Sequence, residues 1–196
     1  MQPKISLKWS WFIVSVVGVI FVSTPFLFRV HDQAIKNTED AIAAEQASLG
    51  IPIRLKIPKI NVDSTIEQVG LTQDGAMDVP KGPADTAWFD LGPRPGETGS
   101  AVIAGHSGYK DGRAAVFDDL YKIEKGDKIY VENTTGDTIT FVVRDIQRYK
   151  PQANAADVFG SSDGVAHLNL ITCTGLWDKV EKTHSDRLVV FTDREI

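Results

Sequence analysis

The chain has 196 residues, a formal net charge of −5 at pH 7 and 42% hydrophobic residues. This length allows one domain with a substantial core plus an appendage, and the composition is that of a folded protein. The negative charge, without a long run of Lys and Arg, excludes a nucleic-acid surface, which needs clustered cations to displace phosphate counterions. We therefore expect no nucleic-acid partner.

The N-terminal segment over residues 9–30 is almost uninterruptedly apolar. As a helix rising about 1.5 Å per residue, it is long enough to cross a hydrocarbon core of roughly 30 Å. We predict that residues 1–30 form a cytoplasmic tip and one transmembrane anchor in the cell membrane, because Lys4 and Lys8 precede the span. Arg29 argues against this orientation. A cleaved signal peptide is the alternative, but the apolar region is too long for one.

The next segment is polar and contains neither Pro nor Gly until Gly50. Its Ala, Glu, Gln and Lys residues favour a helix, so we predict a helical stalk or linker over residues 31–50. Such a stalk would space the body of the protein from the bilayer on its outer side. Its apolar residues could equally form a stripe that docks on the following domain.

From Ile51 onward the chain changes to short apolar runs separated by Gly, Pro and Asp-Gly pairs. This texture is typical of an antiparallel β-sandwich or β-barrel, so we predict an all-β domain over residues 51–196. The clearest local prediction is a hairpin across residues 133–137. Short helical turns are expected at 115–121 and 155–159, where strand periodicity lapses. The predicted strands are 53–57, 65–69, 101–104, 128–132, 138–147, 168–173 and 188–192.

The one cysteine, Cys173, ends the apolar run HLNLITC and precedes a Thr-Gly pair that breaks the pattern. With a period of two, His167, Asn169 and Ile171 share its face of a strand. Oxidising compartments usually pair thiols into disulfides, so an unpaired thiol outside the cytoplasm indicates catalysis or intermolecular pairing. The alternative is a small buried hydrophobe, as most free cysteines are.

Two other residues stand where they could act with a cysteine. A nucleophilic thiol needs a base and a group that stabilises an oxyanion. His106 follows a short apolar strand on a glycine-flanked loop, and Arg187 begins the last strand. If the last two strands pair antiparallel, Cys173 and Arg187 are neighbours at one end of the sheet. The alternatives are a surface histidine in a turn and an arginine in a salt bridge with Asp186 or Asp178.

His167 and His184 are weaker candidates for chemistry. Together with Cys173 and His106 they raise the question of a zinc site, but the sequence has no His-Glu-x-x-His run and no closely spaced ligand pair. We therefore expect no metal and no other cofactor.

Taken together, these motifs resemble the sortase family, over residues 52–192. LITC at 170–173 resembles the family's Thr-Leu-x-Thr-Cys signature. AVIAGH at 101–106 resembles the strand that carries the family's histidine, and HSDRLVVFT at 184–192 resembles the strand that carries its arginine. One departure is Asn169, where the signature usually has Thr. Three further stretches match: IPKINVDSTI at 57–66, GAMDVP at 75–80 and AWFDLGPRPGETGSAVIAGH at 87–106.

The resemblance implies a closed sortase-type β-barrel of about eight strands with short helices, and a cysteine transpeptidase. Its thiolate would attack the Thr–Gly bond of an LPxTG-like sorting signal at the C-terminus of a surface protein. An amine acceptor of the cell wall would then resolve the thioester. Carried over to this sequence, Cys173 is the nucleophile, His106 the general acid/base and Arg187 the holder of substrate or oxyanion. Thr172 would help to shape the substrate site.

The resemblance also bears on the subclass. Pilin-polymerising sortases often carry a lid with an Asp-Pro-aromatic motif before the barrel, and residues 31–50 contain none. The stretch GRAAVFDDLYKIEKGD at 112–127 looks closest to the class E and F enzymes. Two other functions stay open: another cysteine acyl-transfer enzyme, either a hydrolytic peptidase or a wall-crosslinking transpeptidase, and an anchored β-domain that binds a partner.

Overall fold

The computed structural model describes residue 36 and residues 49–108, 112–178 and 183–195. The chain divides into two units, Met1–Glu45 and Gln46–Ile196, and the strands of the described residues belong to the second. The predicted membrane anchor and nearly all of the predicted stalk lie outside the described residues. Within the described part of the chain, no helix is both long and apolar enough to cross a membrane.

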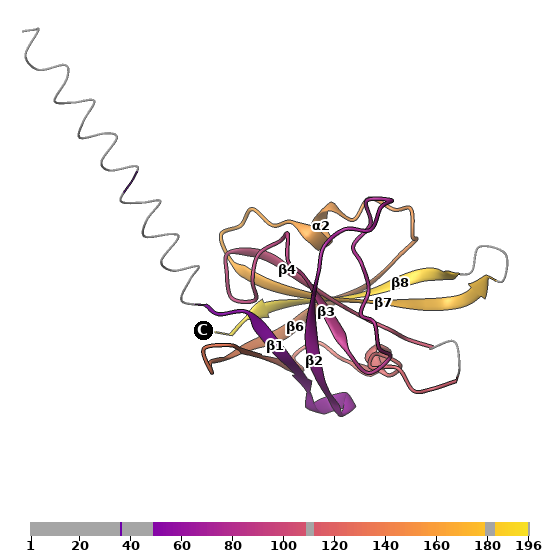
Figure 1. The fold of residues 1–196 in the computed structure, drawn as a ribbon, viewed down its shortest axis with the longest axis horizontal. Helices are drawn as coiled ribbons and strands as arrows, with labels where there is room; N and C mark the ends of the chain where they lie inside the picture. The colour runs from indigo at the N-terminus through magenta and orange to yellow at the C-terminus, as the bar shows by residue number, and fades with distance from the viewer. Residues whose placement is uncertain (1–35, 37–48, 109–111, 179–182, 196) are drawn as a thin grey trace, which may run out of the picture. The chain divides into compact units, whose positions relative to one another are not determined.

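Eight strands of the described residues close into one barrel, as predicted, in the order β1-β2-β3-β4-β7-β8-β6-β5 (Figure 1). The strands are β1 (Pro52–Ile57), β2 (Val62–Val69), β3 (Thr86–Phe89), β4 (Gly99–Gly105), β5 (Lys128–Asn133), β6 (Thr138–Tyr149), β7 (Ala166–Asp178) and β8 (Thr183–Arg194). The short helices are η1 (Pro58–Ile60), η2 (Leu120–Lys122) and α2 (Ala156–Phe159).

The barrel is mixed rather than purely antiparallel, which corrects the sequence-based expectation. β2 pairs with β3, and β4 with β7, in parallel. A parallel pair needs a long crossover connection, which the segment 70–85 supplies between β2 and β3. β3 carries no sequence signal, because its four residues are too few to show alternation and three of them are buried.

The strand carrying Cys173 is longer than predicted. The expected strand ends at Cys173, whereas β7 continues to Asp178 and β8 begins at Thr183, so both form a long two-stranded ribbon (Figure 1). The pattern breaks at Gly175 because the register shifts there, and this glycine has a φ of 83°. Gly175 therefore marks a bulge in a continuing strand rather than its end.

The inward faces of the strands form one apolar core. Leu168 and Leu170 of β7 belong to it, as do Leu188 and Val190 of β8. Phe117, from the turn before η2, is 1% exposed and packs in the same cluster. Replacing such a side chain with Ala would destabilise the protein by about 3–5 kcal/mol. The core thus fixes the strands on which the chemistry-bearing residues lie.

The outward faces of β4, β7 and β8 are covered by a second apolar cluster that includes α2 (Figure 1). Val102, Val158, Val189 and Phe191 are its buried members. Asn169 of β7 lies fully buried, and its amide donates a hydrogen bond of 2.7 Å to the carbonyl oxygen of Val158. This bond holds α2 against the outer face of β7.

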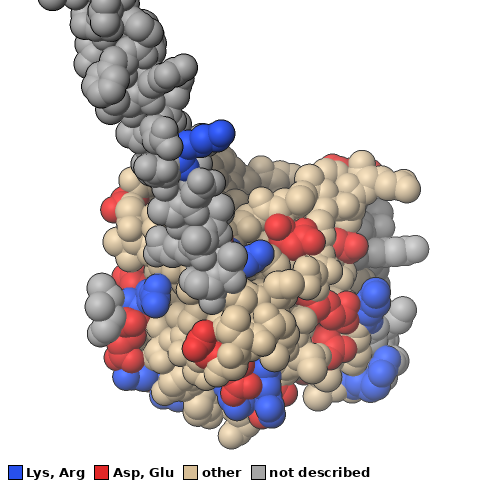
Figure 2. Space-filling view, turned by 60° about the vertical axis from the view of Figure 1, so that its left-hand side comes forward, with Lys and Arg blue, Asp and Glu red and all other residues tan. Residues whose placement is uncertain are grey.

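Several charged side chains on the barrel surface pair with side chains of opposite charge. Figure 2 shows acidic and basic residues interspersed on the face that it presents. Arg54 pairs with Asp63 at 2.6 Å, and Lys128 with Glu195 at 2.7 Å. Exposed pairs of this kind contribute about 0–1 kcal/mol each, so they neutralise charge more than they stabilise the fold.

Candidate active site

Cys173 and Arg187 are direct cross-strand partners. β7 and β8 pair antiparallel with Cys173 opposite Arg187, so the neighbours predicted from the sequence are confirmed. The alternation of buried core residues along both strands turns Cys173 and Arg187 to the outer face. Directly opposed residues have Cβ atoms about 5 Å apart. The Cys173 side chain, whose thiol is unpaired and which is partly buried, therefore starts beside the Arg187 side chain on this face.

His106 lies on the other side of Cys173. It follows β4 directly, as predicted, and β4 pairs in parallel with β7 up to Ala104 opposite Ile171. Extending this register by two residues places His106 alongside Cys173, on a strand about 4.8 Å away. Because β4, β7 and β8 are consecutive in the barrel, the imidazole, the thiol and the guanidinium come from three adjacent strands.

The backbone at His106 is held from the core side. Its carbonyl accepts a hydrogen bond of 2.9 Å from the amide of Phe117. The residue before it must be glycine, because a Cβ on Gly105 would overlap the ring of Phe117. Asp118 accepts hydrogen bonds from the amides of Gly108 and Ala115, both at 2.8 Å. The two ends of the loop after His106 are thereby tied together.

The imidazole of His106 also has a defined contact. Its Nε2 lies 2.8 Å from the carbonyl oxygen of Pro80, in the long connection between β2 and β3. Neither Pro80 nor Asp118 stands out in the sequence as a site residue. An Asp that bonds nearby amides could have been found from its place in a turn, whereas the Pro80 contact uses a backbone oxygen that every residue has.

Arg187 is oriented by neutral oxygen atoms. Its Nη1 donates to the carbonyl oxygens of His184 and Asp186 at 3.2 and 3.1 Å, and its Nη2 donates to Thr183 Oγ1 at 3.1 Å. The predicted alternative, a salt bridge with Asp186, is not what forms, because the Asp186 carboxylate pairs with Lys150 at 2.7 Å. The hydrogen bond from Lys150 is the first cause that lowers the pKa of Asp186. Among the described residues, no carboxylate is paired with Arg187.

Thr172 lies beside the thiol but faces the barrel interior. It is 4% exposed, and its hydroxyl donates a hydrogen bond of 2.7 Å to the carbonyl oxygen of Gly105. This bond ties the strand of Cys173 to the residue before His106. Its place fits a role in shaping the site through β4, while a direct contact with substrate stays a prediction.

The other two histidines occupy different places. His184 lies close to the site, since a Cβ added to Gly108 would be 3.6 Å from its Nε2, and its ring stacks edge-on against Trp177 at 5.1 Å. His167 is six residues before Cys173, roughly 20 Å along the strand. It is buried between Asp163 and Asp193, at 3.0 and 2.7 Å. Of the two, only His184 borders the predicted site.

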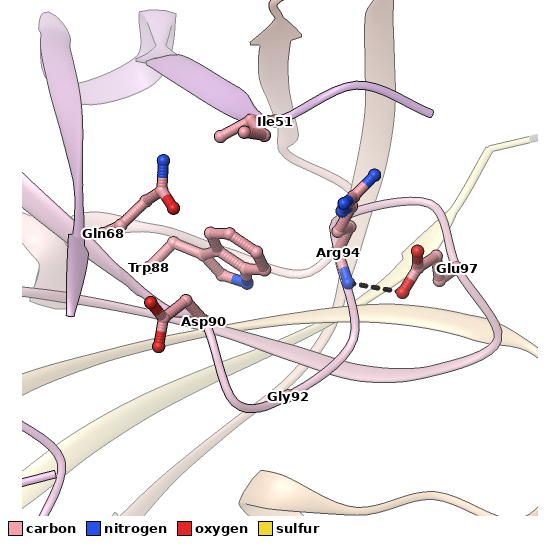
Figure 3. A pocket seen from close by; sticks show the side chains of 7 residues that line it. All are labelled: Ile51, Gln68, Trp88, Asp90, Gly92, Arg94 and Glu97. Carbon is pink, nitrogen blue, oxygen red and sulfur yellow. Dashed lines mark hydrogen bonds between the residues drawn. The ribbon is translucent and has the colours of Figure 1, made fainter. Parts of the chain in front are cut away.

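A polar hollow of about 340 Å³ lies away from these residues (Figure 3). β3 starts beside Gly105 and runs away from the site, and the hollow lies at its far end around the buried Trp88. The indole Nε1 donates a 3.0 Å hydrogen bond to the carbonyl oxygen of Pro93. The lining residues are Ile51, Gln68, Trp88, Asp90, Gly92, Arg94 and Glu97, none of which is a predicted catalytic residue.

A thiol between an imidazole and a guanidinium, brought together by three adjacent strands of a closed barrel, has the parts that cysteine-based acyl transfer requires. A family model described as the sortase domain matches residues 55–195. The chain therefore belongs to the sortase family, whose members are cysteine transpeptidases.

Solved structures of sortases are similar to this chain. Sortase A from Corynebacterium diphtheriae, a lid mutant, gives a TM-score of 0.59 at 26% identity, over 74% of this chain and 70% of that one. Sortase C-1 from Actinomyces oris gives a TM-score of 0.59 at 28% identity, over 74% of this chain and 75% of that one. Streptococcus agalactiae sortase C1 gives a TM-score of 0.58 at 27% identity, over 74% of this chain and 67% of that one. A comparison with curated protein sequences found no match. The class E or F assignment stays a prediction, since these neighbours are named A and C.

Proposed function

We propose that this sortase cleaves an LPxTG-like sorting signal of a surface protein between Thr and Gly and transfers the new Thr carboxyl group to an amine of the cell wall. Cys173 is the nucleophile, His106 the general acid/base, and Arg187 the residue that stabilises the oxyanion. The observation that carries the proposal is the direct pairing of Cys173 with Arg187, next to the strand that leads into His106.

The reaction proceeds in two halves. His106 takes the proton of the Cys173 thiol, and the thiolate adds to the Thr carbonyl carbon, so that a negative oxygen forms. The guanidinium of Arg187 stabilises this oxygen, because it is permanently charged and offers several donors in one plane. The carbon–nitrogen bond then breaks, and the Gly amine leaves with the proton from His106. An incoming amine attacks the thioester, gives its proton back through His106, and releases the free thiol.

The environment of Arg187 supports this role. Its described acceptors are neutral oxygens, which orient the guanidinium without cancelling its charge. An electrostatic group that is already oriented stabilises a developing charge without reorganising at the moment of reaction. The apolar cluster around Val158 and Val189 covers the same outer face up to Ile171, so the site lies beside an apolar region of that face.

We further propose that the enzyme is a single-pass membrane protein with a cytoplasmic N-terminus and an extracytoplasmic catalytic domain. The apolar residues 9–30, preceded by Lys4 and Lys8, support this topology. Sorting signals and wall amines both lie outside the membrane in this arrangement. Labelling of an added N-terminal and an added C-terminal cysteine in intact cells, in a Cys173→Ala background, would test it: only the C-terminal one should react with an impermeant reagent.

The decisive experiment follows an LPETG peptide by mass spectrometry with the full chain in mild detergent and an excess of a small amine. We expect a new product in which the peptide ends in Thr joined to the amine. The Cys173→Ala variant should form none, since losing a nucleophile removes nearly all chemical rate enhancement. A thioester mass on Cys173, seen when the amine is omitted, would identify the intermediate.

Other outcomes lead to different functions. A product that is hydrolysed whether or not the amine is present would indicate a hydrolytic peptidase. Absence of cleavage by a folded wild-type protein, with LPETG and with related signals, would contradict the proposal and favour a wall-crosslinking enzyme or a binding domain. Circular dichroism of both proteins supplies the control for folding.

A further inference from the structure

The connection between β2 and β3 reaches the predicted acid/base residue. The Pro80 carbonyl oxygen lies 2.8 Å from Nε2 of His106, although the two residues are 26 positions apart. A carbonyl oxygen has lone pairs and no hydrogen, so the imidazole nitrogen must be the donor in this bond. A neutral imidazole carries one N–H, and if this proton is on Nε2 then Nδ1 holds the lone pair.

The Pro80 carbonyl is held in place from both sides. Pro80 is buried, and its ring fixes its own φ. Before it, the amide of Asp78 donates to the carbonyl oxygen of Gly70 at 3.0 Å, and Met77 packs against the outer-face cluster. After it, the carbonyl oxygen of Pro83 accepts a 2.8 Å hydrogen bond from the amide of Val116. The acceptor is therefore preorganised rather than a passing contact of a surface loop.

The far side of the same segment is equally constrained. Ser64 of β2 donates from its hydroxyl to the carbonyl oxygen of Ala84 at 2.9 Å, and Thr65 donates to Asp85 at 2.6 Å. These bonds anchor the return of the chain into β3, whose first residue pairs with Gly105 beside His106. The barrel itself thus sets the position of the Pro80 oxygen relative to the imidazole.

We propose that Pro80 is a positioning residue whose carbonyl oxygen keeps His106 in its Nε2–H tautomer, so that Nδ1 is the atom that exchanges protons with the substrate and with Cys173. This inference rests on the proposed role of His106. In the reaction, the thiol proton passes to Nδ1 and produces an imidazolium that still donates from Nε2 to Pro80. The proton on Nδ1 then goes to the leaving amine, and the original tautomer returns.

The first test is a measurement of the tautomer that requires no activity. We would record the ¹⁵N spectrum of the full chain labelled in its histidine rings, with the His106 signals assigned by the His106→Gln variant. The expected result is a protonated Nε2 and an unprotonated Nδ1 in the neutral ring. A protonated Nδ1, or an even mixture of the two tautomers, would overturn the proposal. A peptide that is not transferred despite the expected tautomer would instead count against the proposed function alone.

The second test removes the constraint on the acceptor. Pro80→Gly should mix the two tautomers and lower kcat by about tenfold with little change in KM, because a misplaced base loses part of its contribution. Pro93→Gly is the matched control, since its carbonyl also accepts a side-chain hydrogen bond, from Trp88 at the far end of β3. It should change neither quantity.

If Pro80→Gly does not fold, a backbone change keeps the test decisive. Replacing Lys81 with its α-hydroxy analogue turns the Pro80 carbonyl into that of an ester, a weaker acceptor, and alters no side chain. The same loss of tautomer preference is expected. A tautomer ratio unchanged from wild type in this protein would show that Pro80 does not set it.

Discussion

Two regions of the β7–β8 pairing hold cationic side chains through different kinds of acceptor. At one end, His167 lies between the carboxylates of Asp163 and Asp193, and Arg144 also pairs with Asp193 at 3.0 Å. Further along the pairing, in its middle, Cys173 lies opposite Arg187, whose described acceptors are all neutral oxygens. In the first region, His167 and Arg144 both contact carboxylates.

The kind of acceptor distinguishes a side chain that stabilises the fold from one that can bind a ligand. A carboxylate on a guanidinium or imidazolium satisfies its charge, so the group is held firmly and has little attraction left for a ligand. A carbonyl or hydroxyl oxygen orients the same group and leaves its charge available. A histidine or arginine in this protein is therefore best judged by its acceptors rather than by its residue type.

We expect the largest difference in kcat/KM between the Arg187→Ala and Arg144→Ala variants. Removal of Arg187 should lower kcat/KM for an LPETG peptide by about 10²–10³-fold, the loss typical of one oxyanion donor. Arg187→Lys should recover only part of it, since an ammonium lacks the planar set of donors. Arg144→Ala should leave kcat/KM unchanged. Equal losses in both variants would contradict the distinction between the two regions.

His167→Gln should lower the stability of the protein and leave its activity unchanged. One side-chain amide cannot satisfy both carboxylates that the buried ring contacts, so the free energy of unfolding should fall by about 1–3 kcal/mol. Activity per folded molecule should remain that of wild type. Urea unfolding with active-site titration by an alkylating agent measures both quantities. A loss of kcat without a loss of stability would mean that His167 takes part in the chemistry.

A smaller effect is expected from giving Arg187 a carboxylate partner. Thr183→Asp places an anion where the hydroxyl now accepts from the guanidinium. We expect kcat/KM to fall by about tenfold, because the new ion pair competes with the developing oxyanion. Thr183→Asn supplies a neutral acceptor of the same size and should lose clearly less. Comparable losses in both variants would show that the acceptor's charge is irrelevant.

The smallest expected effect concerns acid stability at the His167 end. The pKa of Asp163 lies well below its ordinary value, first because its carboxylate accepts a hydrogen bond from the Val165 amide, then from Ser161 and His167. A depressed pKa stabilises the fold above the unfolded value of about 4, and this contribution is lost as the pH falls towards the folded value. Thermal unfolding of Asp163→Asn between pH 7 and pH 2 should therefore decline less steeply below about pH 4 than that of wild type. Parallel curves would refute this assignment.

The sequence was sufficient for much of this picture because the relevant signals are local. Alternation along residues 168–173 and 188–192 reveals two consecutive strands, and antiparallel pairing of consecutive strands makes Cys173 and Arg187 neighbours. The sequence did not predict that the strand continues past Gly175, since a glycine after a strand pattern is equally compatible with the end of a strand and with a bulge.

Other features could not be read from local pattern. His106 reaches Cys173 through a parallel pairing of β4 with β7, and nothing in the spacing of the two strands indicates that partnership. Here only the resemblance to a family supplied the expectation. The Pro80 contact is harder still, because it uses a backbone oxygen whose position depends on the whole β2–β3 connection.

The parallel pairing of β4 with β7 also has a consequence for folding. Cys173 and Arg187 come together when the hairpin between the consecutive strands β7 and β8 forms. The hydrogen bond between Thr172 and Gly105, in contrast, closes a loop of 67 residues. Closing long loops costs entropy before any contact compensates for it, so non-local pairings form late. The nascent enzyme should therefore bring its thiol and guanidinium together first and acquire its imidazole last. Catalytic activity would then report closure of the barrel rather than formation of its strands.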